Sequence, residues 1–224
     1  MERMDFLLVH GSTQGPGGYD RMAAALQDRG HRTVAADLPV DRPEWTAGQY
    51  ADLARGQAAG LTEPVLVVHS AAGVVAPAIA AAVGARHVAW LGAVVPDPGR
   101  SVMDELAADP GMFGAEWHDW TGDLEGAPAE TAYFLFHDCD LATLRWALST
   151  TRLWPVRSLF EAPGAPLADL PPSTSVVPTE DRTLTPDWMR RVARERLKTD
   201  PIDVPGGHCP HVSRPEQVAA LLDR

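Results

Sequence analysis

The stretch from Val65 to Val75 constrains the fold more than any other part of the chain. Its first residues, Val65 to Val68, are apolar and mostly β-branched, which is typical of a strand buried on both faces of a parallel sheet. The run of alanine, glycine and valine from Ala71 to Val75 predicts a helix that packs closely against that strand. The chain therefore has to turn sharply from strand to helix at His69 and Ser70.

Ser70 occupies this turn. A serine at such a position presents its hydroxyl above the edge of the sheet, beside the unpaired N–H groups of the first helical turn. The usual pattern around a reactive serine of this kind is G-x-S-x-G, but Val68 and Ala72 stand at the outer positions here. Taken alone, the motif favours a helix N-cap or a buried hydroxyl, so other parts of the chain have to decide its role.

Composition narrows the class of protein. The chain has 224 residues, of which 45% are hydrophobic, which is enough for one substantial core and one domain. Its formal net charge of -11 argues against nucleic acid and anionic membrane surfaces as partners. Two cysteines, Cys139 and Cys209, are too few and too far apart for a disulfide framework or a metal knuckle. Because the N-terminus has no apolar segment behind a basic start, we expect a cytoplasmic protein.

The rest of the chain alternates strands with helices. Strands are predicted at 6–10, 33–36, 65–69, 87–95, 175–177 and 201–204, and helices at 19–29, 45–59, after Ser70, at 187–197 and from a cap at Ser213. This spacing indicates βα units with right-handed crossovers. The predicted fold class is α/β, with a mostly parallel central sheet and helices on both faces.

The alternation stops between residues 99 and 157. This segment carries most of the aromatic side chains: Phe113, Trp117, Trp120, Tyr133, Phe134, Phe136, Trp146 and Trp154. An insertion after a strand of an open α/β sheet lies over the crevice where such sheets bind ligands, so we expect a small cap on a single domain of residues 1–224. Most of these aromatic residues are expected only to pack the cap onto the body.

Three reactive side chains follow three predicted strands. Ser70 follows the central strand, Asp181 follows a later strand, and His208 follows the last one. Because the carboxyl ends of parallel strands meet at one edge of a sheet, these side chains are expected to lie near each other. Their order along the chain, Ser then Asp then His, is that of the α/β-hydrolase fold.

On these residues the chain resembles the α/β-hydrolase superfamily, and within it the small capped branch that holds plant methyl esterases, hydroxynitrile lyases and bacterial esterases. The matching blocks are Val9-His10-Gly11 with its glycine-rich loop, Asp37-Leu38-Pro39, His69 to Gly73, Thr179 to Arg182, and Gly207 to Pro215. Any one block is common, but all of them in this order are not.

The resemblance implies a role for each matching residue. Ser70 would be the nucleophile, His208 its general base, and Asp181 the carboxylate that orients the imidazole. The backbone N–H groups of Ser12 and Ala71 would form the oxyanion hole, in which losing one donor typically costs roughly 3 kcal/mol of transition-state stabilisation.

Three residues compete for these roles. Glu180 is adjacent to Asp181, and Asp97 follows the preceding strand, as the acid does in some members of the superfamily. His211 is an alternative to His208, although the two glycines before His208 favour a tight loop there. We expect His211 to pack against the last helix or to cap it.

The substrate pocket is expected to be apolar. Trp117, Trp120 and Phe136 are predicted to line it, and His10, Gly11 and His69 are predicted to flank it. His10 and His69 also invite a metal assignment, but no third ligand stands at a zinc-like spacing. We therefore expect neither a metal nor a cofactor.

The resemblance also bears on the reaction. The cyanohydrin-cleaving members carry a threonine and a lysine where this chain has Gly11 and Cys209, so ester hydrolysis through an acyl-enzyme is the favoured prediction. The expected partner is a small carboxylic ester, such as a methyl ester or a lactone, and a homodimer is one oligomeric option. Alternatives are a C–C lyase, a cyclase or decarboxylase, and a ligand receptor that has lost turnover.

Overall fold

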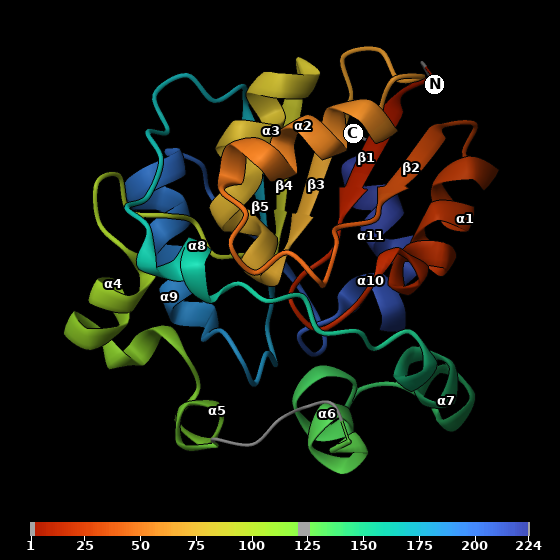
Figure 1. The fold of residues 1–224 in the computed structure, drawn as a ribbon. Coiled ribbons are helices and arrows are strands. Elements are labelled where there is room, and N and C mark those ends of the chain that lie inside the picture. Colours follow the sequence, from red (N-terminus) through yellow and green to blue (C-terminus); the bar gives the residue numbers. More distant parts are fainter. Residues whose placement is uncertain (1–2, 121–125, 224) are drawn as a thin grey trace.

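The computed structural model describes residues 3–120 and 126–223. Its centre is one six-stranded sheet in the order β2-β1-β3-β4-β5-β6, and every pair of neighbouring strands is parallel (Figure 1). The strands are β1 (Asp5–Val9), β2 (Arg32–Ala36), β3 (Val65–His69), β4 (His87–Leu91), β5 (Ser173–Pro178) and β6 (Ile202–Val204). The predicted α/β class with a parallel sheet is confirmed.

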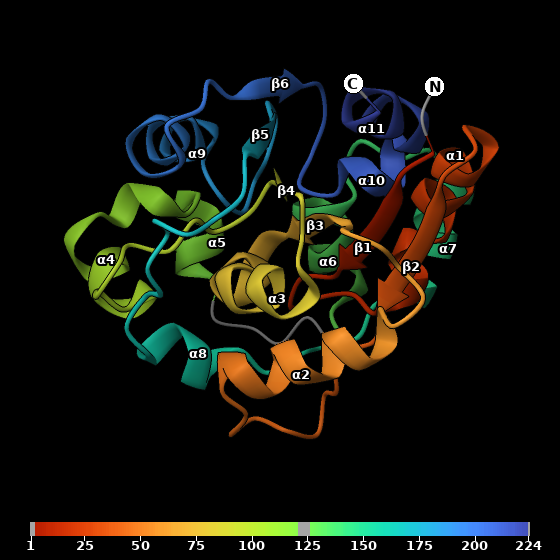
Figure 2. The same cartoon turned by 90° about the horizontal axis from the view of Figure 1, so that it is seen from above.

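Helices cover both faces of this sheet (Figure 2). One face carries α2 (Ala47–Gln57), α3 (Ala76–Val83) and α9 (Pro186–Val192), and the other carries α1 (Asp20–Asp28) and α11 (Pro215–Leu222). Alternate residues of β3 enter the two cores: Leu66 and Val68 pack on the α2 and α3 side, whereas Val65 and Val67 pack on the α1 and α11 side. This explains the uninterrupted apolar run of the central strand.

Several element boundaries differ from the prediction. β4 ends at Leu91, well before residue 95, because Gly92 has a φ of 50° and turns the chain out of the sheet. The helix after β3 begins as the 3-10 segment η2 (Ser70–Val75), and α9 continues as the π-helical turn η4 (Ala193–Leu197).

The prediction that Ser213 is the N-cap of the last helix is wrong. Ser213 is the last residue of α10 (Pro210–Ser213), and α11 begins with Pro215, so Arg214 and not Ser213 occupies the N-cap position. The Ser213 hydroxyl donates instead to a carboxylate oxygen of Asp138, at 2.7 Å.

Between residues 99 and 157 the chain forms short helices at the carboxyl edge of the sheet (Figure 1). They are α4 (Val102–Ala108), η3 (Pro110–Met112), α5 (Ala115–Asp119), α6 (Pro128–Leu135) and α7 (Leu141–Ser149), and α8 (Arg157–Glu161) follows. Residues 121–125 of the predicted cap lie outside the described residues. Phe134, Leu135 and Phe136 form a small core there with Val212 of α10.

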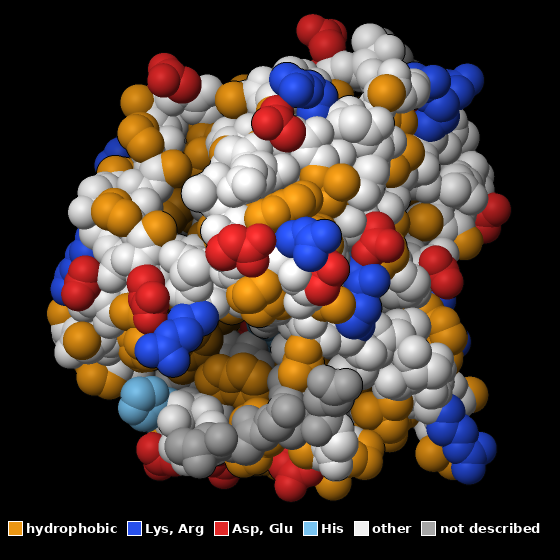
Figure 3. Space-filling view, viewed as in Figure 1, with side chains coloured by type: hydrophobic (Ala, Val, Ile, Leu, Met, Phe, Trp, Pro, Cys, Tyr) orange, Lys and Arg blue, Asp and Glu red, His pale blue; other side chains and the backbone are white. Residues whose placement is uncertain are grey.

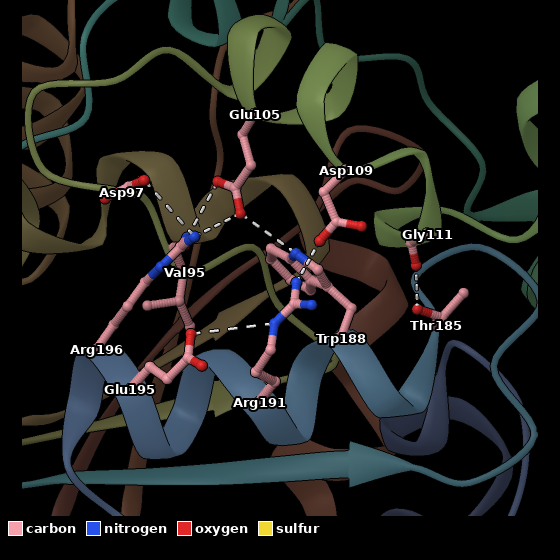
Figure 4. A network of polar contacts seen from close by, with 10 residues as sticks. All are labelled: Val95, Asp97, Glu105, Asp109, Gly111, Thr185, Trp188, Arg191, Glu195 and Arg196. Atoms are coloured by element: carbon pink, nitrogen blue, oxygen red, sulfur yellow. Dashed lines mark hydrogen bonds and ion pairs between the residues drawn. The ribbon is translucent and has the colours of Figure 1, made fainter.

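A partly buried ion pair between Glu105 and Arg196 holds α4 against the body. Glu105 accepts hydrogen bonds from the guanidinium of Arg196 and from the indole N–H of Trp188, the latter at 3.2 Å (Figure 4). Arg196 also donates to the backbone oxygen of Val95, just beyond β4. The start of the 99–157 segment is therefore fixed to α9 and η4.

Helices in the described ranges are all too short, or too polar, to cross a membrane.

Candidate active site

Ser70 has a backbone conformation that few residues other than glycine adopt. Its φ is 54°, in the left-handed region, at the point where β3 passes into η2. Two neighbouring glycines leave no room for larger residues: a Cβ added to Gly73 would lie 1.8 Å from the backbone oxygen of Val94, and one added to Gly11 would lie 2.7 Å from the side-chain Cβ of Ser70. Strain of this kind, held by tight packing, is typical of functional sites.

The structure brings together the side chains of Ser70, His208 and Asp181, as predicted from the sequence. The Ser70 Oγ lies 2.9 Å from Nε2 of His208, and Nδ1 of His208 lies 2.7 Å from Oδ2 of Asp181. The three residues come from the carboxyl ends of β3, β5 and β6. With the Ser70 hydroxyl donating to Nε2, the Nδ1–H of His208 donates to Asp181, and the hydrogen bonds form one chain.

Asp181 is held by its own loop. Its Oδ1 accepts the backbone N–H groups of Thr183 and Leu184, at 2.7 and 3.1 Å, and the Thr183 hydroxyl at 2.8 Å. With His208 on the other oxygen, every neighbour of this carboxylate is a donor, as an ionised carboxylate requires. Sequence reasoning did not single out Thr183, although an aspartate two residues before a threonine is a recognisable turn signal.

The competing residues lie elsewhere. Glu180 is exposed, and its backbone N–H bonds the Gly206 oxygen. Asp97 approaches Arg196, at 3.9 Å, at the network of Figure 4. His211 is buried, and its Nε2 donates to the Gln14 side-chain oxygen at 3.0 Å. Within the described part of the chain, none of these three contacts the His208 ring or the Ser70 hydroxyl by a hydrogen bond.

Three other histidines near the site, His10, His69 and His211, make hydrogen bonds that hold the surrounding structure together. His69 donates from Nε2 to the backbone oxygen of His208, at 2.9 Å, and burial lowers its pKa well below the ordinary value. His10 donates to the Gly11 oxygen and accepts the Leu38 N–H, and burial lowers its pKa to about 4. Burial also lowers the pKa of His211, to about 3. These rings are therefore neutral near pH 7.

His69, Cys209 and His211 place their donor atoms within 4.8 Å of one another. Sequence spacing missed this proximity because His69 is the last residue of β3, while the other two residues follow β6. Burial raises the pKa of the Cys209 thiol well above its usual value, and metals bind the thiolate. His69 already donates a hydrogen bond to the His208 backbone oxygen. These three side chains are therefore better explained as packing residues than as metal ligands.

The loop that carries Ser12 is held by hydrogen bonds from the last part of the 99–157 segment. The backbone N–H of Trp154 donates to the Ser12 oxygen at 2.8 Å, and that of Arg152 donates to the Thr13 oxygen at 3.3 Å. The Ser12 N–H has no acceptor among the described residues. Ala71 lies in the first turn of η2, where N–H groups lack helical acceptors. Both residues line the cavity described next.

A cavity of about 180 Å³ lies over Ser70. Its walls are Ser12, Thr13, Ser70, Ala71, Val94, Phe113, Trp117, Leu135, Val156, Phe160, Thr183, Leu184 and His208. Asp, Glu, Lys and Arg are absent from this set of described residues. In the space-filling view, hydrophobic side chains gather in a hollow between the body and the helices at the bottom of the view (Figure 3).

The cavity walls correct part of the expected pocket. Trp117 lines the cavity, but Trp120 and Phe136 do not. Trp120 packs against Trp117 and Phe134, with ring centroids 5.7 Å apart in both pairs, and Phe136 is buried in the same small core. His10, Gly11 and His69 stand behind the walls, among the residues that support the turn.

A second cavity, of about 820 Å³, opens between residues 166–173 and the η4 region. It is lined by Asp97 and Arg196 among others, and it includes neither Ser70 nor His208. We therefore take the smaller cavity as the candidate active site, since that one contains the hydrogen-bonded chain.

Comparisons with known proteins agree with this architecture. Polyneuridine aldehyde esterase superimposes with a TM-score of 0.80 at 20% identity, over 99% of both chains. A pyrethroid hydrolase from Sphingobium faniae JZ-2 gives 0.75 at 17%, over 99% of this chain and 96% of that one. A methylesterase, MES16, from Arabidopsis gives 0.74 at 17%, over 99% and 98%. No curated protein sequence matches significantly.

At these identities the solved structures show a shared fold. The family assignment comes from a model of the alpha/beta hydrolase family, which matches residues 6–221 and so spans the sheet, the Ser70 turn and the His208 loop. On this match, the chain belongs to the alpha/beta hydrolase family.

Proposed function

We propose that the chain is a serine hydrolase that cleaves a small carboxylic ester through an acyl-enzyme. The observation that carries the proposal is the unbroken hydrogen-bonded chain from Ser70 through His208 to Asp181, with its serine end in an apolar cavity. A hydroxyl alone is a poor nucleophile, and this arrangement supplies a base for its proton and a carboxylate for the base.

Acylation would use each group once. The Ser70 Oγ attacks the ester carbonyl carbon while Nε2 of His208 takes its proton, and Asp181 stabilises the imidazolium that results. The oxyanion is placed against the backbone N–H groups of Ser12 and Ala71. The tetrahedral intermediate collapses, the C–O bond breaks, and His208 returns the proton to the departing alcohol.

Deacylation repeats the sequence with water. His208 takes a proton from a water molecule, the resulting hydroxide equivalent attacks the acyl carbon, and Ser70 leaves with the proton that His208 carries. The products are the free acid and the free enzyme. Besides the substrate and water, the proposed steps use only side chains and backbone groups of this chain.

The cavity favours a compact, uncharged substrate. At about 180 Å³ it is smaller than the 300 to 1,000 Å³ typical of drug-sized pockets. Its walls are mostly aliphatic and aromatic, so a charged acyl group would lose hydration without gaining an ion pair. The names of the structural neighbours, an aldehyde esterase, a methylesterase and a pyrethroid hydrolase, support an ester as the substrate class.

The C–C lyase alternative has less support. Gly11 has no side chain to hydrogen-bond a cyanohydrin, and the residue after the base is the buried thiol of Cys209, which supplies no cation. The only lysine in the sequence, Lys198, lines the separate cavity near η4.

Fluorophosphonate labelling tests the proposal. The wild-type protein should be labelled and should hydrolyse a short nitrophenyl ester, whereas Ser70→Ala should show neither reaction. Ser149→Ala is the matched control, because that serine is exposed and its hydroxyl donates to the Trp146 oxygen. A wild-type protein that is not labelled would favour a receptor. Turnover retained in Ser70→Ala would favour a cyclase or decarboxylase that uses His208 without an acyl-enzyme.

A further inference from the structure

Thr183 touches both partners of the proposed base and acid. Its hydroxyl oxygen lies 2.8 Å from Oδ1 of Asp181 and 2.6 Å from Nδ1 of His208. The side chain is buried, and the residue lines the cavity over Ser70. Two hydrogen-bond contacts from one buried hydroxyl, both inside the proposed triad, call for an explanation beyond packing.

The chemistry of a hydroxyl allows both contacts at once. A threonine has one O–H donor and two acceptor lone pairs. The donor can only face Asp181, because that carboxylate has no proton to give while it accepts from His208. The lone pairs then face the Nδ1–H of His208, which is left with two acceptors, one on Asp181 and one on Thr183.

We propose that Thr183 is a positioning residue of the triad: its hydroxyl fixes the carboxylate of Asp181 and is a second acceptor for the Nδ1–H of His208. This inference rests on the proposed function. During attack by Ser70 the ring becomes an imidazolium, and hydrogen bonds from a charged donor are stronger than those from a neutral one. Thr183 should therefore stabilise the transition state more than the resting enzyme.

The backbone around Thr183 is held from the other side. The N–H of Gly114 donates to the Thr183 oxygen at 2.7 Å, and the N–H of Thr185 donates to the Met112 oxygen at 3.0 Å. A short antiparallel bridge joins Phe113 to Leu184 between these two bonds. The hydroxyl is thus placed by the 99–157 segment as well as by its own loop.

The test compares Thr183→Val, which removes the hydroxyl at nearly constant volume, with Thr183→Ser, which keeps it. Thr179→Val is the matched control, because that threonine is exposed in the same loop. We expect Thr183→Val to lose about 10-fold in kcat with little change in KM, which is the factor expected for one hydrogen bond to a charged group. Thr183→Ser should recover most of this loss.

The pH profile of kcat/KM distinguishes a role of Thr183 in positioning the His208 ring from a general loosening of the loop that carries Thr183. Removing an acceptor destabilises the protonated ring, so the acid limb of kcat/KM should move to lower pH in Thr183→Val and return in Thr183→Ser. Among the described residues, the titratable groups that face the ring are Asp181, which the variant leaves in place, and two histidines. The ring centroid of His69 lies 4.7 Å away, and His211 is close enough to interact with His208 electrostatically.

Two outcomes would overturn the inference: a Thr183→Val enzyme with wild-type kcat, or one that loses rate with an unmoved acid limb. Labelling of Ser70 by the fluorophosphonate distinguishes these outcomes from failure of the proposed function. If the wild type is labelled at Ser70 and Thr183→Val reacts at the same rate, only the role of Thr183 is wrong. If Ser70 is never labelled, the proposed function is wrong.

Discussion

The sheet and the 99–157 segment are both rich in apolar residues, but they are held together differently. The strands pair along their length, and β3 has every side chain buried. The inserted helices are short and leave large apolar side chains such as Leu141 and Tyr133 exposed, at 61% and 43%. The sheet fixes the reactive groups through backbone geometry, whereas the inserted segment supplies cavity walls through side chains.

Reactivity and substrate choice should therefore depend on different parts of the molecule. Ser70, His208 and Asp181 all come from strand ends, while Phe113, Trp117 and Leu135 of the cavity wall come from the inserted segment. Changes at the sheet edge should therefore alter reactivity, and changes in the segment should alter which substrates are accepted. The inserted segment contacts the reactive edge of the sheet through two hydrogen bonds, from Trp154 to Ser12 and from Gly114 to Thr183.

The largest effect is expected at the sheet edge. His208→Ala should reduce kcat for a short nitrophenyl ester by a factor of about 10,000 or more, since it removes the base that hydrogen-bonds the Ser70 hydroxyl. His211→Ala is the control: its ring is buried beside His69 and bonds Gln14, so most activity should remain. Equal losses in the two variants would show that the base is assigned to the wrong histidine.

A smaller effect is expected on the free energy of unfolding, which should depend on pH through two buried histidines. The pKa values of His10 and His211 are lowered by burial to about 4 and about 3, while an unfolded histidine titrates near 6.5. Between these values the unfolded chain binds more protons, so stability is fully present above pH 6.5 and is lost as the pH falls. Each ring should contribute about 2 kcal/mol of destabilisation between pH 7 and pH 5.

Urea unfolding at several pH values measures this loss. His211→Asn should make the dependence of unfolding free energy on pH shallower by about one proton around pH 5. His118→Asn is the control, because His118 is a histidine that is exposed on α5. An unchanged slope in His211→Asn would mean that this ring is not kept neutral by the fold.

The smallest effect is expected in the inserted segment, where a change in the cavity wall should alter substrate preference. Trp117→Ala enlarges the cavity, so the ratio of kcat/KM for a bulky benzoyl ester to that for an acetyl ester should rise about 10-fold. Trp120→Ala removes the same side chain from the neighbouring position, which does not line the cavity, and should leave the ratio nearly unchanged. Similar ratios in both variants would contradict the assignment of the wall.

The parts that sequence reasoning predicted depend on local signals. The apolar run of β3, the tight turn at Ser70 and the order of Ser70, Asp181 and His208 can each be read from neighbouring residues and from the alternation of strands and helices. The parallel sheet follows from the same alternation. These features carry the fold and bring the three predicted side chains to one edge.

What sequence reasoning missed depends on contacts between distant segments. The second acceptor at Thr183, the proximity of Cys209 and His211 to His69, and the exclusion of Trp120 from the cavity are set by packing across many residues. The early end of β4 depends on the left-handed conformation of Gly92, where an apolar run gives no warning.

The proposed function requires a covalent acyl intermediate on Ser70, and intact-mass analysis after rapid quench detects this intermediate. With a nitrophenyl ester, the wild-type chain should gain the mass of one acyl group, and peptide mapping should place it on Ser70. The adduct should be absent in Ser70→Ala and should not build up in His208→Ala. Hydrolysis without any adduct at Ser70, or an adduct on another residue, would contradict the account.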